Sequence, residues 1–485
     1  MPRNRASRST LATRASDDLS EVLLLSIWSE FGKRLGSARQ NIKPPKISGP
    51  LRVINVRRKG EKKAEKPGRK KYEYCEPEAS VLLNQRAVWD RLKGGEKPEE
   101  ALGASSSVLK VHHIPHFSVI VTTYEPVLRY FEQTLISVLS QTYGGFELII
   151  ADTSMSNGVR ETLDHYRDER IRYYSVPGNR GEASLINDAA FLATGNYICT
   201  VDVGDLLTKD ALYEVFLYIM RTGAEILYTD EDHCDATGRK FDQPNRKPDF
   251  NKDYLLSNNY MRRLLVIRRE LFLALRLRDA FDGALTYDLI LRAPKSEVYH
   301  VPHILYHVSS ASSDSRRAER EPDAEIAAEK AALEDYFRVR SIRATVSFTG
   351  RRRIYRISYT PNIFACRSDV GVLGGRVLSR THKVVGGMFD ADGKVMFEGM
   401  DEADGGPMNR ALSVQNAFAV DARCIQVRPE LRRLFEEIVG KPGDEIFTES
   451  ARDPAELRRR SILFCAKVRE LGYLIVWDPS FITII

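Results

Sequence analysis

FSVIVTTYEP, residues 117–126, opens the stretch that decides the fold, and GNYICTVDVGDLLTKDAL, residues 195–212, closes it. A second apolar run, FELIIAD (146–152), lies between them. Both FSVIVTTY and FELIIAD have strand length and are largely apolar, as strands buried on both faces are. The segment after the first run carries apolar side chains at helical spacing. This alternation of strands and helices predicts an α/β fold with a mostly parallel, twisted, doubly wound sheet.

Acidic residues stand at the ends of the predicted strands. Asp152 ends the second run, Asp202 and Asp205 follow the third, and residues 230–232 end ILYTDED. The carboxyl ends of parallel strands meet at one edge of a sheet, where ligands bind. Because gathered carboxylates repel one another, we expect a hard divalent cation and a diphosphate there. The alternative is structural: Asp205 and Asp210 would be helix N-caps and Asp152 a turn residue.

A glycine-bearing loop at GNRGEAS (178–184) leads into an alanine-rich segment that is predicted to be a helix. The amides at the start of such a helix can receive a phosphate group. A tight turn alone would explain the same glycines, so both interpretations stay open.

Composition bounds the class of protein. The chain has 485 residues, 43% hydrophobic and 29% charged, which predicts a soluble protein of two or three domains. Its net charge of +7 reflects basic residues concentrated between Lys43 and Lys71, which predict a solvated arm or a contact with anionic lipid. The arm has no interleaved aromatic residues, which disfavours nucleic-acid binding. Six cysteines without a C-x-x-C pair predict buried, reduced thiols.

No apolar window is long enough to span a membrane. SEVLLLSIWSEFGKRL (20–35) is predicted to be a helix that is docked on the protein or lies at a membrane interface. We therefore expect a cytoplasmic protein, with peripheral contact at the inner face of the membrane as an option.

The chain divides into four predicted parts. Residues 1–110 form an N-terminal extension with helices and the basic arm, and residues 116–315 form the main domain. A charged linking helix within 320–343 follows. Residues 344–485 are predicted to form a smaller α+β module, because they are β-rich, carry a turn signal at Asp390–Gly393 and include a late helix.

The main domain resembles the family-two inverting glycosyltransferases of the GT-A fold, especially bacterial enzymes that build cell-surface polysaccharides such as rhamnose-containing ones. The matching segments, in family order, are SVIVTTYEP, SVLSQTYGGFELIIAD, GNRGEASLINDAAFLATGNYI, TVDVGDLLTKDALYEV, ILYTDED, KPDFNKDYLLSNNYM, VIRRELF, FDGALTYDLILRA and HVPHILYH. The C-terminal segments GGRVLSRTHKVVGGMFDADGKVMFEGM, AVDARCIQVRPELRRLFEE and FCAKVRELGYLIVWDP resemble the acceptor half of a second, truncated GT-A-like module.

The resemblance implies a UDP- or dTDP-sugar donor, a divalent cation (Mn or Mg) and a glycan or lipid-linked acceptor. Carried over by position, the donor-binding residues are Thr122 and Tyr124 beside the nucleobase, Asp152 bound to it, Asn179 and Gly181 in the loop near the ribose and phosphates, and Asp202 at the ribose or metal. The implied metal ligands are Asp202, Asp205 and His307, with a core histidine as the alternative for His307.

The chain departs from the family pattern at two carboxylates. The family motif Asp-x-Asp is here Asp202-Val203-Gly204, and Asp205 is the expected substitute ligand. The family's catalytic base falls on Thr286, so Asp288 and Asp282 are the expected replacements. Residues 461–465, SILFC, lack both carboxylates of the corresponding motif in a second module.

Two functions remain open from the sequence. The first is an active, metal-dependent hexosyl or rhamnosyl transferase that inverts the anomeric centre, with a displaced carboxylate as general base. The second is a catalytically degenerate relative that binds nucleotide, glycan or a partner transferase.

Overall fold

The computed structural model describes residues 72–104, 108–111, 113–176, 178, 180–294, 298–312, 322–351, 353–441 and 453–485. The predicted helix at 20–35 and the basic arm at 43–71 lie outside these residues. By its internal contacts, Pro67–Ile485 is one compact unit. Two larger sheets dominate it, one within residues 117–309 and one within 370–484.

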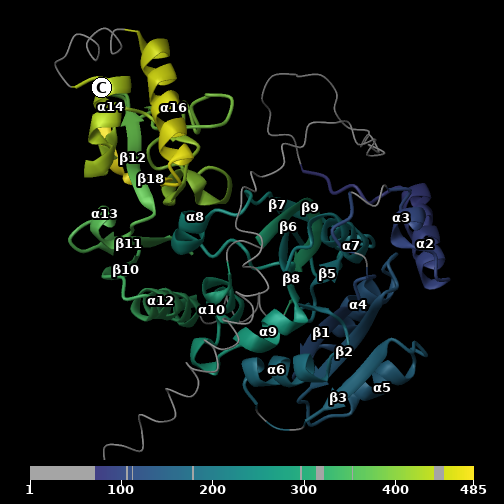
Figure 1. Cartoon of the computed structure of the whole chain (residues 1–485). Helices are drawn as coiled ribbons and strands as arrows, with labels where there is room; N and C mark the ends of the chain where they lie inside the picture. Colours follow the sequence, from purple (N-terminus) through teal and green to yellow (C-terminus); the bar gives the residue numbers. More distant parts are fainter. Residues whose placement is uncertain are drawn as a thin grey trace, which may run out of the picture. The chain divides into compact units, whose positions relative to one another are not determined.

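The first sheet has nine strands in the order β3-β2-β1-β4-β8-β6-β9-β5, with β7 paired to β6 (Figure 1). Its strands are β1 Phe117–Thr123, β2 Phe146–Asp152, β3 Ile171–Ser175, β4 Tyr197–Thr200, β5 Leu206–Leu207, β6 Ile226–Cys234, β7 Phe241–Asn245, β8 Leu265–Arg268 and β9 Val298–Ser309. The α/β fold class is confirmed. The pairs β1–β2, β2–β3, β1–β4 and β6–β9 are parallel, whereas β8 runs antiparallel between β4 and β6, so the sheet is mixed.

Helices cover both faces of this sheet (Figure 1). They are α4 Leu128–Leu139, α5 Gly158–Asp164, α6 Glu182–Leu192, α7 Ala211–Thr222, α9 Arg269–Leu275 and α10 Leu285–Arg292. The short helix α8, Lys252–Ser257, instead lies against β11 Tyr355–Tyr359 and β15 Gln415–Asn416. Alternate residues of β1 divide between two cores, because successive side chains of a strand point to opposite faces. Val119 and Val121 pack with α4 and α7, while Ile120 packs with α6, α9 and α10.

The N-terminal helices are α2 Ala79–Lys93 and α3 Pro98–Ala101. Helix α2 docks on the first domain because the Trp89 ring packs against Tyr143, with ring centroids 4.8 Å apart, and Thr142 donates a 2.8 Å hydrogen bond to Gln85. The predicted linking helix is α12, Pro322–Val339.

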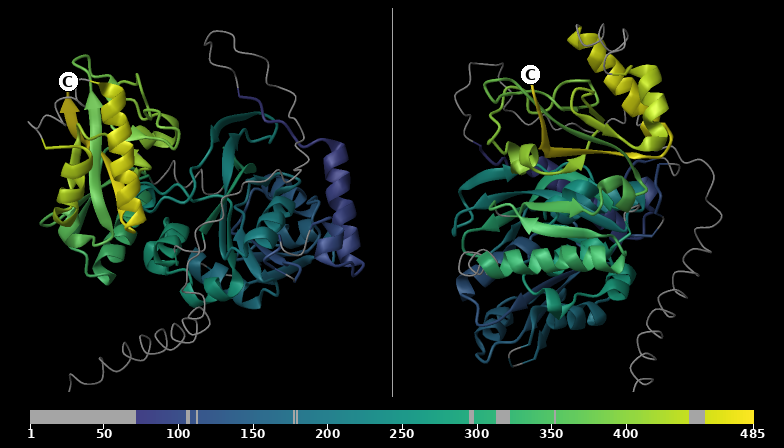
Figure 2. Two further views of the ribbon diagram at one scale, coloured as in Figure 1. Left: turned by 45° about the horizontal axis from the view of Figure 1, so that its top comes forward. Right: turned by 90° about the vertical axis from the view of Figure 1, so that its left-hand side faces the viewer.

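The C-terminal residues form a smaller α+β module, as predicted. Its elements are β10 Ala344–Phe348, β11 Tyr355–Tyr359, α13 Ile363–Cys366, β12 Val370–Leu378, β13 Val384–Gly386, β14 Met388–Phe389, β15 Gln415–Asn416, β16 Ala419–Val420, β17 Ile425–Val427, α14 Arg432–Ile438, α16 Pro454–Glu470 and β18 Leu474–Ile484. Helix α16, yellow in Figure 2, lies along the strands β12 and β18. A turn at residues 390–393 is present where the sequence signalled one.

All six cysteines lie in the described residues as free thiols; Cys199, Cys234, Cys424 and Cys465 are buried as predicted, whereas Cys75 is exposed and Cys366 is only partly buried. None of the described helices has the length and apolar character needed to cross a membrane.

Candidate functional site

The predicted nucleobase residues gather where β1 and β2 end. The two strands are in parallel register, with Thr123 opposite Asp152. Asp152 is buried: its Oδ1 accepts hydrogen bonds from Thr123 Oγ1 (2.7 Å) and the Ser154 amide (3.0 Å), and its Oδ2 accepts one from the Tyr173 hydroxyl (2.8 Å). Asp152 therefore braces the sheet edge, whereas the Tyr124 side chain is 65% exposed and available to a ligand.

Glu125 fixes the loop that carries Tyr124. Its carboxylate accepts hydrogen bonds from the Met155 amide (2.8 Å), the Ser156 amide (3.0 Å) and the Ser156 hydroxyl (2.6 Å). These hydrogen bonds, led by that of the Ser156 hydroxyl, lower the pKa of Glu125 below its usual value. The brace joins the loops after β1 and β2, and sequence reasoning did not identify it.

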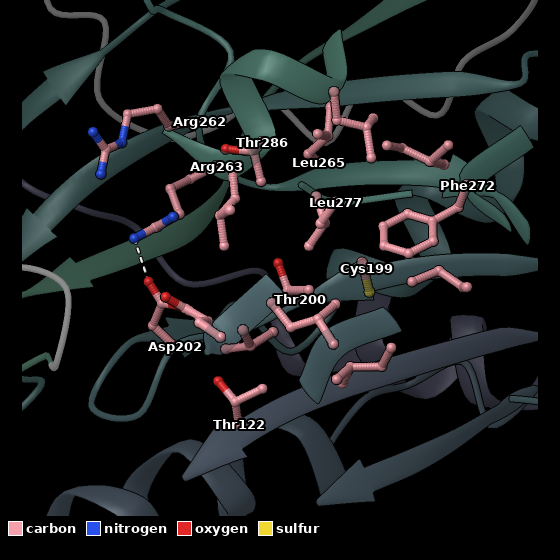
Figure 3. Close-up of a pocket in the computed structure, with 18 of the residues that line it drawn as sticks. Thr122, Cys199, Thr200, Asp202, Arg262, Arg263, Leu265, Phe272, Leu277 and Thr286 are labelled. Carbon is pink, nitrogen blue, oxygen red and sulfur yellow. Dashed lines mark hydrogen bonds and ion pairs between the residues drawn. The ribbon is translucent and has the colours of Figure 1, made fainter. Parts of the chain in front are cut away.

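A cavity of about 70 Å³ lies between β1, β4 and β8 on one side and α6, α9 and α10 on the other (Figure 3). Its apolar lining includes Ile120, Ile186, Ile198, Leu265, Phe272 and Leu277, and its polar lining includes Thr122, Glu182, Asp202, Arg262, Arg263 and Thr286. Pockets that enclose a whole organic ligand measure roughly 300–1,000 Å³. The cavity by itself is therefore too small to enclose a whole organic ligand.

Asp202 and Arg263 face each other on the wall of this cavity (Figure 3). The guanidinium Nη2 of Arg263 donates a short hydrogen bond to Asp202 Oδ2. The Arg263 side chain is 12% exposed and that of Asp202 is 18% exposed, so the ion pair is partly shielded from solvent. Arg263 was not predicted to belong to the site.

Gly204 is required by the loop that follows Asp202. Its φ angle is +101°, a conformation that side chains rarely adopt. A Cβ atom at this position would lie 2.7 Å from Ser312 Cα, 2.9 Å from Ser312 N and 3.0 Å from the Ala311 carbonyl oxygen. The loop thus has no room for the family's second metal-binding carboxylate.

Asp205 is fully buried and engaged by the protein itself. Its Oδ1 accepts a hydrogen bond from the Ser309 amide (2.8 Å), its Oδ2 accepts one from the Tyr306 hydroxyl (2.7 Å), and Arg263 Nε lies 3.5 Å from Oδ2. Burial raises the pKa of Asp205 to about 7, against the opposing charge of Arg263. Its carboxylate joins β9 to the loop after β4, which leaves it poorly placed as a substitute metal ligand.

His307 is engaged elsewhere than at Asp202 and Asp205. Its Nδ1 makes a short contact with Asp232 Oδ1, and its ring packs edge-on against Tyr74, with ring centroids 4.5 Å apart. The neighbouring residue Tyr306 is the one that contacts Asp205, because consecutive side chains of β9 point to opposite faces. The three predicted ligands therefore do not converge.

Within the described residues, no group of three or more His, Cys, Asp or Glu side chains could hold a metal ion. The acidic run that was expected at a strand end instead lies inside β6, and each carboxylate has its own partner. Asp230 accepts from the Lys247 amide (2.8 Å), Glu231 from Lys247 Nζ (2.9 Å) and Asp232 from the Tyr72 hydroxyl (2.5 Å). The donor set does not fit the divalent cation that the family resemblance implies.

The two predicted bases lie in different surroundings. Asp288 is buried in α10, and two arginines bind its carboxylate. Its Oδ2 accepts hydrogen bonds from Arg278 Nε (3.0 Å) and from Arg292 Nη2 (2.8 Å). Asp282 is exposed directly after the short helix Asp279–Phe281, next to the cavity-lining Gly283. Thr286, at the family's base position, lines the cavity itself. Asp282 is therefore the more accessible of the two predicted bases.

Asn179 lies outside the described residues. Gly181 is the N-cap residue of α6, and Asp279 Oδ1 lies 2.9 Å from the position of a Cβ atom there. The next residue, Glu182, lines the cavity. The start of α6 therefore borders the cavity. Asp210 precedes α7, but its Oδ1 accepts from Thr208 Oγ1 (2.7 Å) and its side chain makes no capping hydrogen bond.

Sequence reasoning missed Arg263, Tyr306 and Glu125. A signal for Arg263 was present, since two consecutive arginines directly precede the apolar segment LLVI. Tyr306 and Glu125 had no comparable signal, because their roles depend on partners about 101 and 31 positions away.

Comparison with known proteins gives an independent assignment. Residues 118–282 match the model of glycosyl transferase family 2. The O-antigen biosynthesis protein RfbC of Myxococcus xanthus is 31% identical over 233 residues, 46% of this chain and 18% of that protein. TuaG of Bacillus subtilis (strain 168), named as a teichuronic acid biosynthesis glycosyltransferase, is 33% identical over 24% of this chain and 46% of its own length. The chain thus spans less than half the length of either relative.

Among solved structures, the mannosyltransferase PcManGT from Pyrobaculum calidifontis, in complex with GDP-Man and Mn2+, has a TM-score of 0.36 and 17% identity. The match covers 54% of this chain and 73% of that one. With a TM-score this low, the family assignment rests on the sequence matches. The sequence matches thus assign residues 118–282 to glycosyl transferase family 2, in agreement with the resemblance expected from the sequence of this domain.

Proposed function

We propose that this protein transfers a sugar from a UDP- or dTDP-sugar donor to a cell-surface polysaccharide or glycolipid acceptor, with inversion at the anomeric carbon. One observation carries the proposal: in a family-two domain, the carboxyl ends of β1, β2 and β4 bring the exposed Tyr124, the buried Asp152 and the partly buried Asp202 to one edge of the sheet, where Asp202 lines the cavity. The names of RfbC and TuaG, which refer to O-antigen and teichuronic acid biosynthesis, support a polysaccharide acceptor.

In this proposal the donor lies across the sheet edge. The exposed ring of Tyr124 stacks on the nucleobase, and Thr122 contacts the same part of the donor from the cavity wall. Asp152 acts mainly by holding the edge rigid, since its carboxylate already accepts three hydrogen bonds. Asp202 accepts a hydrogen bond from a ribose hydroxyl. Gly181, and Asn179 as predicted from the sequence, lie in the loop toward the phosphates.

Asp282 serves as the general base. An inverting transferase needs one carboxylate that takes the proton of the acceptor hydroxyl as that oxygen attacks the anomeric carbon, while the nucleoside diphosphate leaves. Asp282 is exposed and adjoins cavity-lining residues, which supports this role. Asp288 is not part of the proposed mechanism, because its carboxylate is buried and bound by two arginines.

A lipid-linked acceptor would place the reaction at a membrane surface. We include peripheral contact at the cytoplasmic face in the proposal, since the basic residues between Lys43 and Lys71 would attract anionic lipid. Sedimentation with vesicles that contain phosphatidylserine tests this part. Equal sedimentation of the full chain and of a variant lacking residues 1–71 would exclude it.

The transferase proposal is tested by calorimetric titration with UDP, dTDP and GDP, followed by assays of nucleotide release from UDP- and dTDP-sugars. Binding of UDP or dTDP together with release of the nucleotide from one sugar donor is the expected result. Absence of binding by a folded protein would refute the donor class.

The second candidate is a degenerate transferase that binds the nucleotide without turnover. The presence of Thr286 at the family's base position favours it, since threonine is a poor base at neutral pH. Nucleotide binding without release from any donor, with and without polysaccharide acceptors, would support this candidate over the first.

A further inference from the structure

The site holds a positive charge of its own at the place where a divalent cation is expected. Arg263 lines the cavity, donates to Asp202 through Nη2 and places Nε 3.5 Å from Asp205 Oδ2. A single guanidinium group thus contacts both carboxylates that the sequence assigned to a metal. Asp202 and Asp205 flank Gly204, where there is no space for a further carboxylate.

Lys247 and Tyr306 hold Arg263 in this position. The fully buried Lys247 donates a short hydrogen bond from Nζ to the Arg263 carbonyl oxygen, and the same Nζ lies 2.9 Å from Glu231. The ring of Tyr306 lies beside the guanidinium, 5.7 Å from its carbon to the ring centroid. These contacts fix the backbone and one side of the guanidinium, so little side-chain freedom remains to be lost when a ligand binds.

The preceding residue, Arg262, points to a different set of partners. Its guanidinium contacts Glu325 and lies 3.7 Å from Glu329, and both glutamates belong to α12. Arg353 adds a second cation 3.1 Å from Glu325. Arg262 thus pairs with α12, whereas Arg263 contacts the predicted donor-site carboxylates Asp202 and Asp205.

A guanidinium group suits a diphosphate. It presents a planar fork of N–H donors that matches two phosphate oxygens, keeps its charge at all relevant pH values and needs no metal. If Asp202 accepted a hydrogen bond from a ribose hydroxyl in place of Arg263, Nη2 of Arg263 would be able to donate to the diphosphate. Asp202 would then be the partner of Arg263 only while no donor is bound.

We propose that Arg263 takes the place of the divalent cation, so that this protein binds the diphosphate of its donor without metal. The inference rests on the proposed function, because it assigns a counter-charge to the donor of that reaction. It goes beyond the predicted site, in which Asp202, Asp205 and His307 hold manganese or magnesium.

The test is calorimetric titration of the full chain with UDP and dTDP, once in excess EDTA and once in Mn2+. The wild-type affinity is expected to agree within about twofold between the two conditions. Arg263→Gln is expected to lower the affinity at least about tenfold, as the loss of a charge-assisted hydrogen bond would. Arg263→Lys keeps the charge but loses the planar fork of donors, so its nucleotide affinity should lie between those of the wild type and Arg263→Gln.

Arg268→Gln is the matched control. Arg268 ends β8, is 41% exposed and pairs with Glu225 and Glu270 at the surface, so the nucleotide affinity of this variant should equal that of the wild type. Thermal denaturation checks that each variant is folded.

Three results would overturn the inference. Wild-type binding that requires Mn2+ would refute it while leaving the proposed transferase intact. Equal affinities of folded Arg263→Gln and wild type would show that Arg263 is only a structural ion-pair partner. Absence of binding in both EDTA and Mn2+ would refute the donor class as well, and this pattern separates the two failures.

Discussion

Substitution of Gly204 tests the claim that the loop excludes a second metal-binding carboxylate. Aspartate at this position would restore Asp-x-Asp, but its Cβ would lie 2.7 Å and 2.9 Å from backbone atoms of Ser312. Backbone atoms cannot rotate away as a flexible side chain can. We therefore expect Gly204→Asp to destabilise the domain without creating Mn2+ binding.

The magnitude follows from comparison with Gly223, the C-cap of α7. Gly223 also has positive φ, +69°, yet a Cβ atom there would meet nothing nearer than Lys110 Cβ at 3.7 Å. Alanine at either position pays about 1–2 kcal/mol for its backbone conformation. At Gly204 the contact with Ser312 and Ala311 adds about 1–3 kcal/mol, the usual cost of overpacking.

Thermal denaturation followed by circular dichroism measures the difference. At about 2–4 °C per kcal/mol for a domain of this size, Gly204→Ala should melt about 2–12 °C below Gly223→Ala. Equal melting temperatures would refute the steric argument. A stable Gly204→Asp protein that binds nucleotide more tightly in Mn2+ than in EDTA would refute it as well.

Four further variants probe the site. Asp282→Asn should lower sugar transfer about 100-fold or more while nucleotide affinity stays unchanged, and retained transfer would exclude this base. Asp288→Asn should instead lower the free energy of unfolding by about 1–3 kcal/mol, because it leaves two partly exposed arginines without their shared carboxylate; an unchanged urea midpoint would contradict this. Tyr124→Ala should reduce nucleotide affinity about tenfold with no change in melting temperature, and unaltered affinity would remove the stacking role. Burial raises the pKa of Asp205 to about 7, above its unfolded value, so its contribution to stability is complete below the unfolded pKa and is lost as the pH rises through about 7. Asp205→Asn should reduce the pH dependence of the unfolding free energy between about pH 4 and pH 7, and an unchanged slope would assign the effect to other groups.

The sequence by itself determined the class of fold and the family. Runs such as FELIIAD are apolar over strand length, and the periodicity of apolar residues between them is helical, so the α/β alternation is a local property that requires no long-range information. The replacements Gly204 and Thr286 were also visible, because they are single positions within an ordered series of motifs.

Only the tertiary structure decided which side chains meet. Arg263 lies 61 positions from Asp202, and their contact depends on how β8 pairs with β4 and β6. Tyr306 and His307 are adjacent in sequence yet serve different clusters, because neighbouring side chains of a strand point to opposite faces. Asp282 and Asp288 looked equivalent as bases, but the fold buries one between two arginines and exposes the other beside the cavity. The composition of a site can be local, but its geometry is set by register and side-chain direction, which short motifs do not encode.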